Sequence, residues 1–542
     1  MLTFYRKIIN VCKLIFSSFT FYRQTMRYKL KYTLKKIFIH RLKDLGTFLS
    51  AVYALFIGSA LMFLEYHVNF GLLFQINILE TYTRLVAVSN ILISILIGIS
   101  LTTFSVIFVV MQLASSQFSP RILRHFLVND FKMQKFVGLF VGTISLCVLP
   151  QLVSVFFPQT PFLLTLFVGS LFAFYGLAWS YPRMITYLSI NMNVASITNR
   201  IKIDMVEEIN ILYPDTWCVG KNLLNKRSLI DPNKFKIQIL SPFESGYLDS
   251  VNYKKLERVS TYISRSAIAP YFENAYQKPI VGEFIMKDTT VLLALVFNQE
   301  IASHQIAELR QEVNSMVRDA FKVEQFRSHA QDINFGVRKL VDIAIKAISP
   351  AVNDPTTCLN CIDQIGEIAK ELALKEFPSA DSRAVKSKNI HVNEFSFEEF
   401  IDFCYDQIFQ WGKYDPTVVK RILRSIRIIL PLVQNPFHLK ILIQQVVEME
   451  LMTIYNLSNY ENGNLKISKE KLNTIEVELA NFNHKAKQQI SALELKGILK
   501  HYENNHYSDN KGIIRAEIEA IEYLKAFKTA AETTYNNGNE IT

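Results

Sequence analysis

The sequence of 542 residues is poor in cysteine, glycine and proline. It contains 6 Cys, 18 Gly and 16 Pro. So few cysteines in such a long chain form no disulfide framework, and nothing indicates an oxidising compartment. The scarcity of glycine and proline argues against an all-β protein, because such proteins need many tight turns. The length allows roughly three or four domains.

The sequence also lacks the familiar signatures of catalytic sites. It contains no Walker loop, no GxGxxG after a strand, and none of the HExxH, GxSxG or kinase patterns. Cys358 and Cys361 form a single CxxC, but no second CxxC and no neighbouring histidine cluster complete a set of four metal ligands. We interpret both as small core residues of a predicted helix. We therefore expect no enzyme, no metal site and no cofactor.

What the chain has in abundance is apolar side chains, with a block of positive charge at its start. Half of the residues are apolar, which excludes a disordered or collagen-like chain. The formal net charge is +11, and residues Met1–Leu45 contribute +10 of it, with eleven Lys/Arg against Asp44 alone. The high isoelectric point is therefore a property of one short arm.

The segment after this arm distinguishes between two partners for it. Nucleic acid is one partner for a basic arm. The uncharged run Thr47–Leu64 follows, however, and it is about one bilayer long. A basic arm before a first membrane span is the positive-inside pattern, and it suits anionic lipid headgroups. We therefore expect the arm to contact anionic lipid and expect no nucleic acid.

Three more uncharged apolar runs follow: Leu85–Ala114, Phe136–Phe157 and Pro161–Trp179. The first loop between the four runs has a net charge of −1, the second +3 and the third none, and basic residues follow the fourth run. This alternation predicts four transmembrane helices with both termini cytoplasmic. Gly138 and Gly142 form a GxxxG step, which predicts a packing seam inside the bundle or between the protomers of a homo-oligomer.

The predicted fold is thus a four-helix membrane domain with a large cytoplasmic part that is α+β and mostly helical. Strands are predicted at Lys234–Leu240, Ile280–Met286 and Thr290–Phe297. The spacing of Leu248, Val251, Leu256 and Val259 predicts a helix between the first two strands, and from Gln299 onward nearly everything reads as helix. The expected divisions are a basic arm (1–45), the membrane domain (46–182), an α+β domain (183–298), a helical domain (299–535) and a disordered tail (536–542).

Polar residues mark the end of the second apolar run. They are Gln112, Ser115, Ser116, Gln117, Ser119 and Arg121. Because lipid offers no hydrogen-bond partner, polar groups at this depth face protein or water. One interpretation is a helix that leaves the bilayer at the headgroups. The other is that the cluster lines the mouth of a water-filled path.

A second segment with a specific pattern is Gln331–Ile365. Its apolar residues share one helical face, Ser349-Pro350 breaks the helix, and Asp354-Pro355 is typical of the start of another. We predict a helix–turn–helix in which Asp354 is the N-cap. Arg338 and Asp342, four residues apart, form either an ordinary ion pair or, with Asn353 and Asp354, a surface for a ligand or a subunit contact.

These two segments carry a resemblance. The motifs are ASSQFSPRIL, FGVRKLVDIAIKAISPAVNDPTTCLNCID, SGYLDSVNYKKL, the GEFI step at Gly282, and DFCYDQIFQWGKYDPTVVKRIL. In these motifs the chain resembles the bacterial family of predicted membrane proteins designated domain of unknown function 2254. The resemblance implies an integral membrane protein with a few N-terminal spans and a large soluble C-terminal part. It brings no substrate or catalytic residue, and it does not cover the basic arm.

The polar end of the second span, the packing seam and the large cytoplasmic part without an enzyme motif lead to one functional hypothesis. We expect an oligomeric channel or transporter-like protein with a cytoplasmic sensing or gating domain. The alternative is a membrane-anchored scaffold or signalling protein that conducts nothing, and a membrane enzyme comes third. No sequence pattern identifies the ion or solute, the number of subunits or a regulating ligand.

Overall fold

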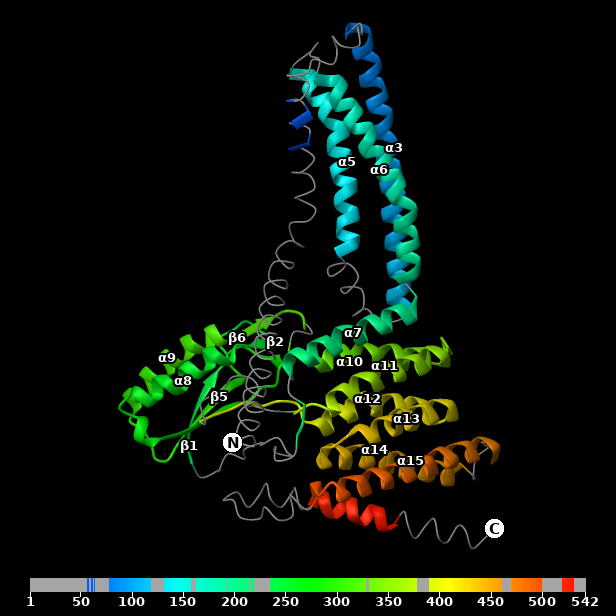
Figure 1. Ribbon diagram of the computed structural model, residues 1–542. Helices are drawn as coiled ribbons and strands as arrows, with labels where there is room; N and C mark the ends of the chain where they lie inside the picture. Colours follow the sequence, from blue (N-terminus) through cyan, green and yellow to red (C-terminus); the bar gives the residue numbers. More distant parts are fainter. Residues whose placement is uncertain are drawn as a thin grey trace, which may run out of the picture. The chain divides into compact units, whose positions relative to one another are not determined.

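The computed structural model describes residues 56–57, 60–61, 63, 78–117, 131–156, 162–191, 193–213, 216–218, 234–327, 331–377, 389–460, 469–499 and 519–530. The chain divides into two compact units, residues 1–193 and 194–542, and each is described by itself (Figure 1). The basic arm and the tail at 536–542 lie outside the described residues, as does most of the run Thr47–Leu64.

The first unit is a bundle of long apolar helices. They are α3 (Ile78–Gln117), α5 (Phe131–Phe156) and α6 (Phe162–Asn191), and each covers all or nearly all of one of the apolar runs of the sequence. Within the described residues, Val86–Val109 of α3 is long and apolar enough to cross a membrane, with a mean hydropathy of 2.4, and Lys135–Leu149 of α5 is a shorter apolar segment. The described fold is therefore mostly helical, with one clear helix of membrane length.

Aromatic and aliphatic side chains hold these three helices together. Leu96 and Ile107 of α3, Phe136 and Phe140 of α5 and Leu177 of α6 are buried in one cluster. The outward faces are apolar too, since Leu101, Phe172 and Trp179 are each about 70% exposed or more. An apolar surface of this kind suits lipid rather than water. Gly138 and Gly142 are both buried, so the GxxxG step packs inside the bundle of a single chain.

The second unit contains two sheets. The larger has the order β1 (Phe235–Leu240), β5 (Val291–Phe297), β3 (Phe272–Gln277) and β7 (Ile390–His391), and only the β3–β7 pair is parallel. The smaller is antiparallel, with the order β4 (Phe284–Ile285), β2 (Gly246–Val251) and β6 (Phe321–Glu324). The helices associated with the sheets are α8 (Tyr253–Arg265), η1 (Ala269–Tyr271) and α9 (Ser303–Ala320).

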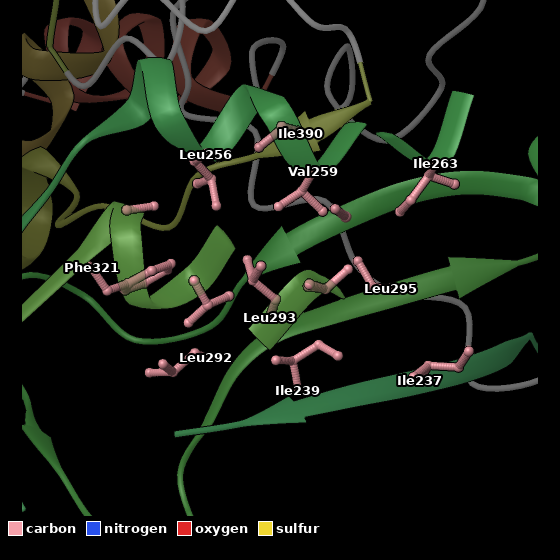
Figure 2. Packing of buried hydrophobic residues seen from close by; sticks show 14 of the residues in the cluster. Ile237, Ile239, Leu256, Val259, Ile263, Leu292, Leu293, Leu295, Phe321 and Ile390 are labelled. Carbon is pink, nitrogen blue, oxygen red and sulfur yellow. The ribbon is translucent and has the colours of Figure 1, made fainter. Parts of the chain in front are cut away.

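Helix α8 buries one face against the larger sheet. Leu256, Val259 and Ile263 lie one helical turn apart and meet Leu293, Leu295 and other strand residues (Figure 2). Asn252 begins the helix, because its side chain accepts the backbone N–H of Lys255 at 3.2 Å. The opposite face of α8 is exposed and carries Arg258 and Arg265.

Three details of this part differ from the sequence expectation. Leu248 and Val251 lie on β2 and not on a helix, because β2 pairs with β4 and with β6, which is more than 70 residues away. The strand expected at Ile280–Met286 is only the two residues of β4. Helix α9 and β6 follow residue 298, yet both pack with the α+β elements, and β7 returns to the larger sheet from beyond residue 380.

The remaining helices form a layered stack (Figure 1). Helix α7 (Val194–Leu212) packs on α10 (Ile333–Ala347) and α11 (Pro355–Ala373), which pack on α12 (Phe397–Gly412) and α13 (Pro416–Ile429). The stack continues through η3 (Leu430–Leu432), α14 (Pro436–Tyr460) and α15 (Lys469–Leu495). Helices α11 and α13 both begin with an Asp-Pro-Thr sequence, a repeat that the sequence analysis did not detect.

Candidate functional site

The residues expected to line a path lie at or beyond the end of α3. Gln112 is exposed on α3. Ser115, Ser116 and Gln117 belong to the last turn of the helix, but their side chains lie outside the described residues, as do Ser119 and Arg121 altogether. The structure thus shows that the helix continues through Gln117, and the role of these polar residues stays a prediction.

Polar side chains join the three long apolar helices at positions other than those predicted from the sequence. Thr103 of α3 donates to the hydroxyl of Tyr181 of α6 at 3.2 Å, and buried Ser89 donates to the Cys147 carbonyl of α5 at 3.0 Å. The Gln151 amide of α5 donates to the Asn90 side chain of α3. Because lipid cannot replace these partners, such bonds fix how the helices pack against one another.

The predicted helix–turn–helix is confirmed. Asp354 is the N-cap of α11: its Oδ1 accepts the Thr357 N–H at 3.1 Å, and its Oδ2 accepts the Thr357 hydroxyl at 2.6 Å. Pro355 is the first helical residue. Asn353 is exposed and has a φ of 48°, a left-handed conformation that asparagine tolerates better than most residues. The Asp354 side chain therefore caps the helix, and Asn353 contributes its left-handed backbone conformation to the turn.

Arg338 and Asp342 are joined to each other, as the spacing predicted. The Arg338 Nε lies 2.8 Å from the Asp342 Oδ1. A guanidinium N–H of Arg338 also donates to Gln407 of α12 at 2.6 Å, and the group lies 5.8 Å from the centre of the Phe403 ring. Arg338 thus connects α10 to α12 within one chain. Whether this half-buried pair also serves a ligand or a second subunit stays a prediction.

Cys358 and Cys361 are fully buried in the helical stack. Burial raises the pKa of Cys358 to about 12, and it raises the pKa of Cys361 well above the usual value of a thiol. A thiol with a raised pKa is a poor nucleophile and a poor metal ligand, because both roles need the thiolate. The interpretation as core cysteines agrees with this placement.

The structure also shows a junction at Gln331–Lys339, in the segment that the sequence singled out but at residues to which the sequence pattern assigned no role. The Gln331 side chain accepts the Val251 N–H at 3.0 Å and donates to the Val251 carbonyl at 3.3 Å. A single side chain therefore hydrogen-bonds to the end of β2 as a neighbouring strand would. The Gln331 N–H donates to the buried Glu208 of α7 at 3.3 Å. Gln331 thus connects the sheets to the helical stack.

Asp332 is the centre of this junction. It is buried, forms a two-pronged ion pair with Arg327 at 2.5 and 3.1 Å, and accepts the Phe335 N–H at 3.1 Å as the N-cap of α10. Gly282 faces this pair with a φ of 95°, and a Cβ there would overlap the Asp332 carboxylate and the Arg327 guanidinium. Only glycine fits this position, which explains the GEFI step.

Helix α10 approaches α7 closely at the same junction. A Cβ on Gly336 would overlap the side chain of Met205 of α7, so the glycine sets the distance between the two helices. Lys339 is 5% exposed, and its ammonium lies 4.8 Å from the centre of the Phe335 ring. Burial lowers the pKa of Lys339 to about 8, although the charges of Asp204 and Asp332 raise it. Its environment, which no local pattern encodes, makes it the most perturbed lysine among the described residues.

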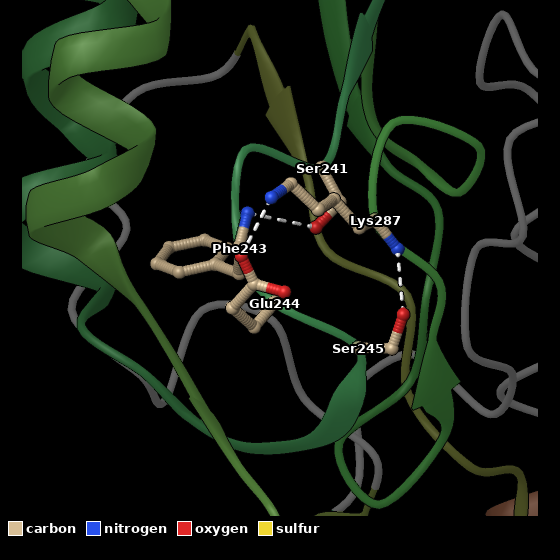
Figure 3. Close-up of polar contacts among 5 residues, drawn as sticks. All are labelled: Ser241, Phe243, Glu244, Ser245 and Lys287. Atoms are coloured by element: carbon tan, nitrogen blue, oxygen red, sulfur yellow. Dashed lines mark hydrogen bonds and ion pairs between the residues drawn. The ribbon is translucent and has the colours of Figure 1, made fainter.

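A second polar contact fastens the loops of the smaller sheet (Figure 3). The Ser245 hydroxyl accepts the Lys287 N–H at 3.1 Å, and the Lys287 ammonium lies 2.5 Å from the Glu244 carboxylate. The Ser241 hydroxyl accepts the Phe243 N–H at 3.4 Å. These contacts hold the β1–β2 loop, which contains the start of the SGYL motif, against the turn after β4.

The chain matches known sequences but no solved structure. The model of the family described as "Predicted membrane protein (DUF2254)" matches residues 46–427. Uncharacterized proteins of Mycobacterium tuberculosis strain H37Rv and of Mycobacterium bovis are each 25% identical to this chain over 332 residues. The alignment spans 59% of this chain and 59% of each relative. No solved structure matches the chain. Because the family model covers more than half of its length and the described residues include a helix of membrane length, the chain belongs to the DUF2254 family of predicted membrane proteins.

Proposed function

We propose that the protein is an oligomeric channel or transporter-like protein of the bacterial inner membrane, whose cytoplasmic unit gates the membrane helices. The proposal includes four spans with both termini in the cytoplasm, because the loop charges alternate in that order. Its homo-oligomeric state is part of the proposal, since channels of few helices per chain enclose a path between subunits.

The observation that carries the proposal is the set of polar side chains in the interior of the bundle. Helix α3 turns Ser89 and Thr103 toward α5 and α6, while its outer face is apolar. The Ser100 hydroxyl is buried without a hydrogen-bond partner among the described residues. A polar interior and an apolar exterior are what a membrane bundle needs if water or a solute is to enter it.

The gating part of the proposal rests on the chain between the two units. Helix α6 ends at Asn191 and α7 begins at Val194, so only two residues lie between them. Helix α7 is held by the stack through Met205 against Gly336, and its Thr198 hydroxyl donates to the Asn360 side chain of α11 at 3.0 Å. A rearrangement of α10 or α11 would therefore pull on α7 and, through two residues, on α6.

Ion flux into liposomes tests the transport function. We expect purified wild-type protein to raise flux above that of empty liposomes under voltage, tension or a pH step. Replacing Gln112 or Ser116 with Leu should reduce that flux by dewetting the mouth of the path. Thr102→Leu is the control, because Thr102 lies on the exposed face of α3 and its hydroxyl bonds only to its own helix, at the Gly98 and Ile99 carbonyls. Equal flux in all four proteins and in empty liposomes would reject transport.

Labelling of introduced cysteines tests the topology separately. Positions near Gln75 and Gln159 should react with an impermeant reagent from outside the cell. Positions near Lys132 and the C-terminus should react only from inside. External labelling of the C-terminus would contradict the four-span arrangement whatever the flux experiment gives.

One observation favours the alternative, a membrane-anchored scaffold that conducts nothing. Trp411 and Tyr414, where α12 ends and α13 follows, are 64% and 51% exposed, and the Lys413 ammonium lies 5.3 Å from the centre of the Tyr414 ring. Exposed aromatic residues beside a cation are common in protein contact surfaces. The scaffold interpretation predicts two results. The purified protein produces no ion flux, and the Trp411→Ala variant no longer binds the cellular partners of the wild type.

A further inference from the structure

A cavity of about 590 Å³ opens between α8 and α9, on the side of α8 that faces away from the sheet. Its base includes Ile268 and Leu309, which are buried, and its wall carries the side chains of Arg258, Tyr262 and Arg265. A volume of this size is typical of a site for a small organic molecule. None of the residues that the sequence analysis selected lies in it.

Two arginines give the cavity a positive side. Arg258 and Arg265 are seven residues apart on α8, which places them two turns apart on the same face of the helix. The Arg258 guanidinium lies 3.8 Å from Asp319, but both side chains are about 60% exposed, so this pair is weak. Among the ion pairs of the described residues, none includes Arg265. Both guanidinium groups can therefore reach an anion in the cavity.

The first turn of α9 also borders the cavity. Helix α9 has 18 residues, and its N-cap is Ala302, whose side chain cannot accept a hydrogen bond. The N–H groups of the first turn thus have no side-chain cap, and Gln305 of that turn lines the cavity. Backbone N–H groups at the start of a helix favour a phosphate group.

The other side of the cavity is acidic and can accept hydrogen bonds. Glu308 of α9 lines the wall opposite the two arginines of α8. The Tyr262 phenol is a hydrogen-bond donor at neutral pH, and burial together with the charges of Glu308 and Glu312 raises its pKa further. An anion alone would be repelled by Glu308. A molecule with an anionic end and a hydroxyl-bearing end matches both sides.

We propose that this cavity binds a small phosphomonoester, with its phosphate at Arg258 and Arg265 and its hydroxyl groups at Glu308. Arginine suits this role because its planar group donates two parallel hydrogen bonds to phosphate oxygens. Carboxylates accept well from sugar hydroxyls, so a sugar phosphate has the right chemistry at both ends. The proposal does not depend on transport and stands if the protein conducts nothing.

Titration calorimetry on the full-length protein in detergent, at constant ionic strength, tests the proposal. The probes are ribose 5-phosphate, ribose and inorganic phosphate, with a short-chain phosphatidic acid to separate a lipid headgroup from a soluble ligand. We expect ribose 5-phosphate to bind most tightly and ribose not to bind. Tighter binding of the phosphatidic acid would keep the phosphate site and assign it to lipid.

Variants locate the two ends of the ligand. Arg265→Ala and Arg258→Ala should each lower the affinity for ribose 5-phosphate about tenfold, the usual effect of losing a charge-assisted bond. Arg310→Ala is the matched control, because Arg310 is an exposed arginine of α9 that does not line the cavity. Glu308→Gln should reduce the preference for ribose 5-phosphate over inorganic phosphate. All four residues are exposed, so the variants should fold.

Two results would overturn the proposal. One is no binding of any phosphate probe at millimolar concentration. The other is an equal loss of affinity in Arg310→Ala and Arg265→Ala, which would mean that the phosphate senses only the general positive charge of the surface.

Discussion

The two helical hairpins of the stack, α10–α11 and α12–α13, begin their second helices with the same Asp-Pro-Thr sequence and differ in what they bury. Asp354 caps α11 through Thr357, and Asp415 caps α13 by accepting the Thr417 N–H at 2.9 Å and the Thr417 hydroxyl at 2.6 Å. Both caps precede a proline and a threonine. The local start of the helix is therefore repeated, because it depends on only three or four residues.

The surroundings of the hairpins are not repeated. Helix α10 buries Lys339 next to α7 and the sheets, and the pKa of this lysine is lowered. Helix α12 instead places Asp402 near other acids, and the pKa of Asp402 is raised to about 7 by burial and by the charges of Asp406, Glu398 and further acids. The two hairpins thus share a local sequence but bury charges of opposite sign, a lysine in one and an aspartate in the other. The reason is that the neighbours of each helix come from different parts of the chain.

The largest effect should come from the contact that joins the two hairpins. A Cβ on Gly366 of α11 would overlap the Ser425 hydroxyl of α13, which bonds to the buried Tyr405 hydroxyl at 2.9 Å. Gly366→Ala should therefore lower the free energy of unfolding by about 2–3 kcal/mol, through overpacking and a lost buried hydrogen bond. Thermal unfolding measures this. The double variant with Ser425→Ala should recover part of the loss, and an unchanged transition in the single variant would contradict the close contact.

Lys339→Met tests the buried charge of the first hairpin. Because burial lowers the pKa of the lysine from 10.5 to about 8, the unfolded chain binds the proton more tightly between these values. The wild type should therefore gain up to about 3 kcal/mol of stability as the pH rises from 8 to 10.5. In Lys339→Met this slope should be absent, and the variant should be about 2 kcal/mol more stable at pH 7. If stability depends on pH in the same way in both proteins, a group other than Lys339 causes that dependence.

Asp402→Asn tests the opposite case in the second hairpin. The folded pKa of about 7 lies above the ordinary value of 3.8, so the wild type should lose stability as the pH rises from about 4 to 7. Because Asp402 is half-buried and water screens it, we expect a difference of only about 1–2 kcal/mol. Asp402→Asn should flatten the curve in urea unfolding. Asp406→Asn is the comparison variant: its amide oxygen can still accept the 2.6 Å bond from the Gln445 amide but no longer carries the negative charge that strengthens it, so this variant should stabilise less.

The smallest effect tests the shared feature. Asp354→Ala and Asp415→Ala should each cost about 1 kcal/mol of local stability, since each leaves first-turn N–H groups without an acceptor. Hydrogen exchange should rise at Thr356–Cys361 in the first variant and at Thr417–Ile422 in the second. Pro355→Ala should change exchange less, because the missing proline N–H needs no partner there. Unchanged exchange in both aspartate variants would mean that the caps contribute nothing.

Much of the fold was predictable because its signals are local. The apolar runs became α3, α5 and α6, the β-forming runs became β1 and β5, and the Asp354-Pro355 pattern became a capped helix start. Helix α5 continues through Pro150 to Phe156, close to the end of the apolar run Phe136–Phe157. Leu248 and Val251 were misread, because a three- or four-residue spacing of apolar residues also occurs along a partly buried strand.

The candidate site was predicted only in part. Arg338 was selected for its spacing to Asp342, whereas the neighbouring Lys339 proved to be the buried charge. The signal that was available is the composition of the motif: Gln331, Asp332 and Lys339 are polar residues beside a strongly apolar helix face. The Asp-Pro-Thr repeat at Asp354 and Asp415 was also visible in the sequence, 61 residues apart.

The sequence by itself determined the membrane character of the chain, its family and the starts of its capped helices. An uncharged run longer than the bilayer, or an aspartate before a proline, acts on its nearest neighbours in the chain and needs no distant partner. Only the tertiary structure decided that Gln331 fastens Val251, that Gly282 and Gly336 set close contacts, and that Lys339 loses its water. Each of these depends on a partner that lies far away in sequence or on burial by several elements, and only packing brings those groups together.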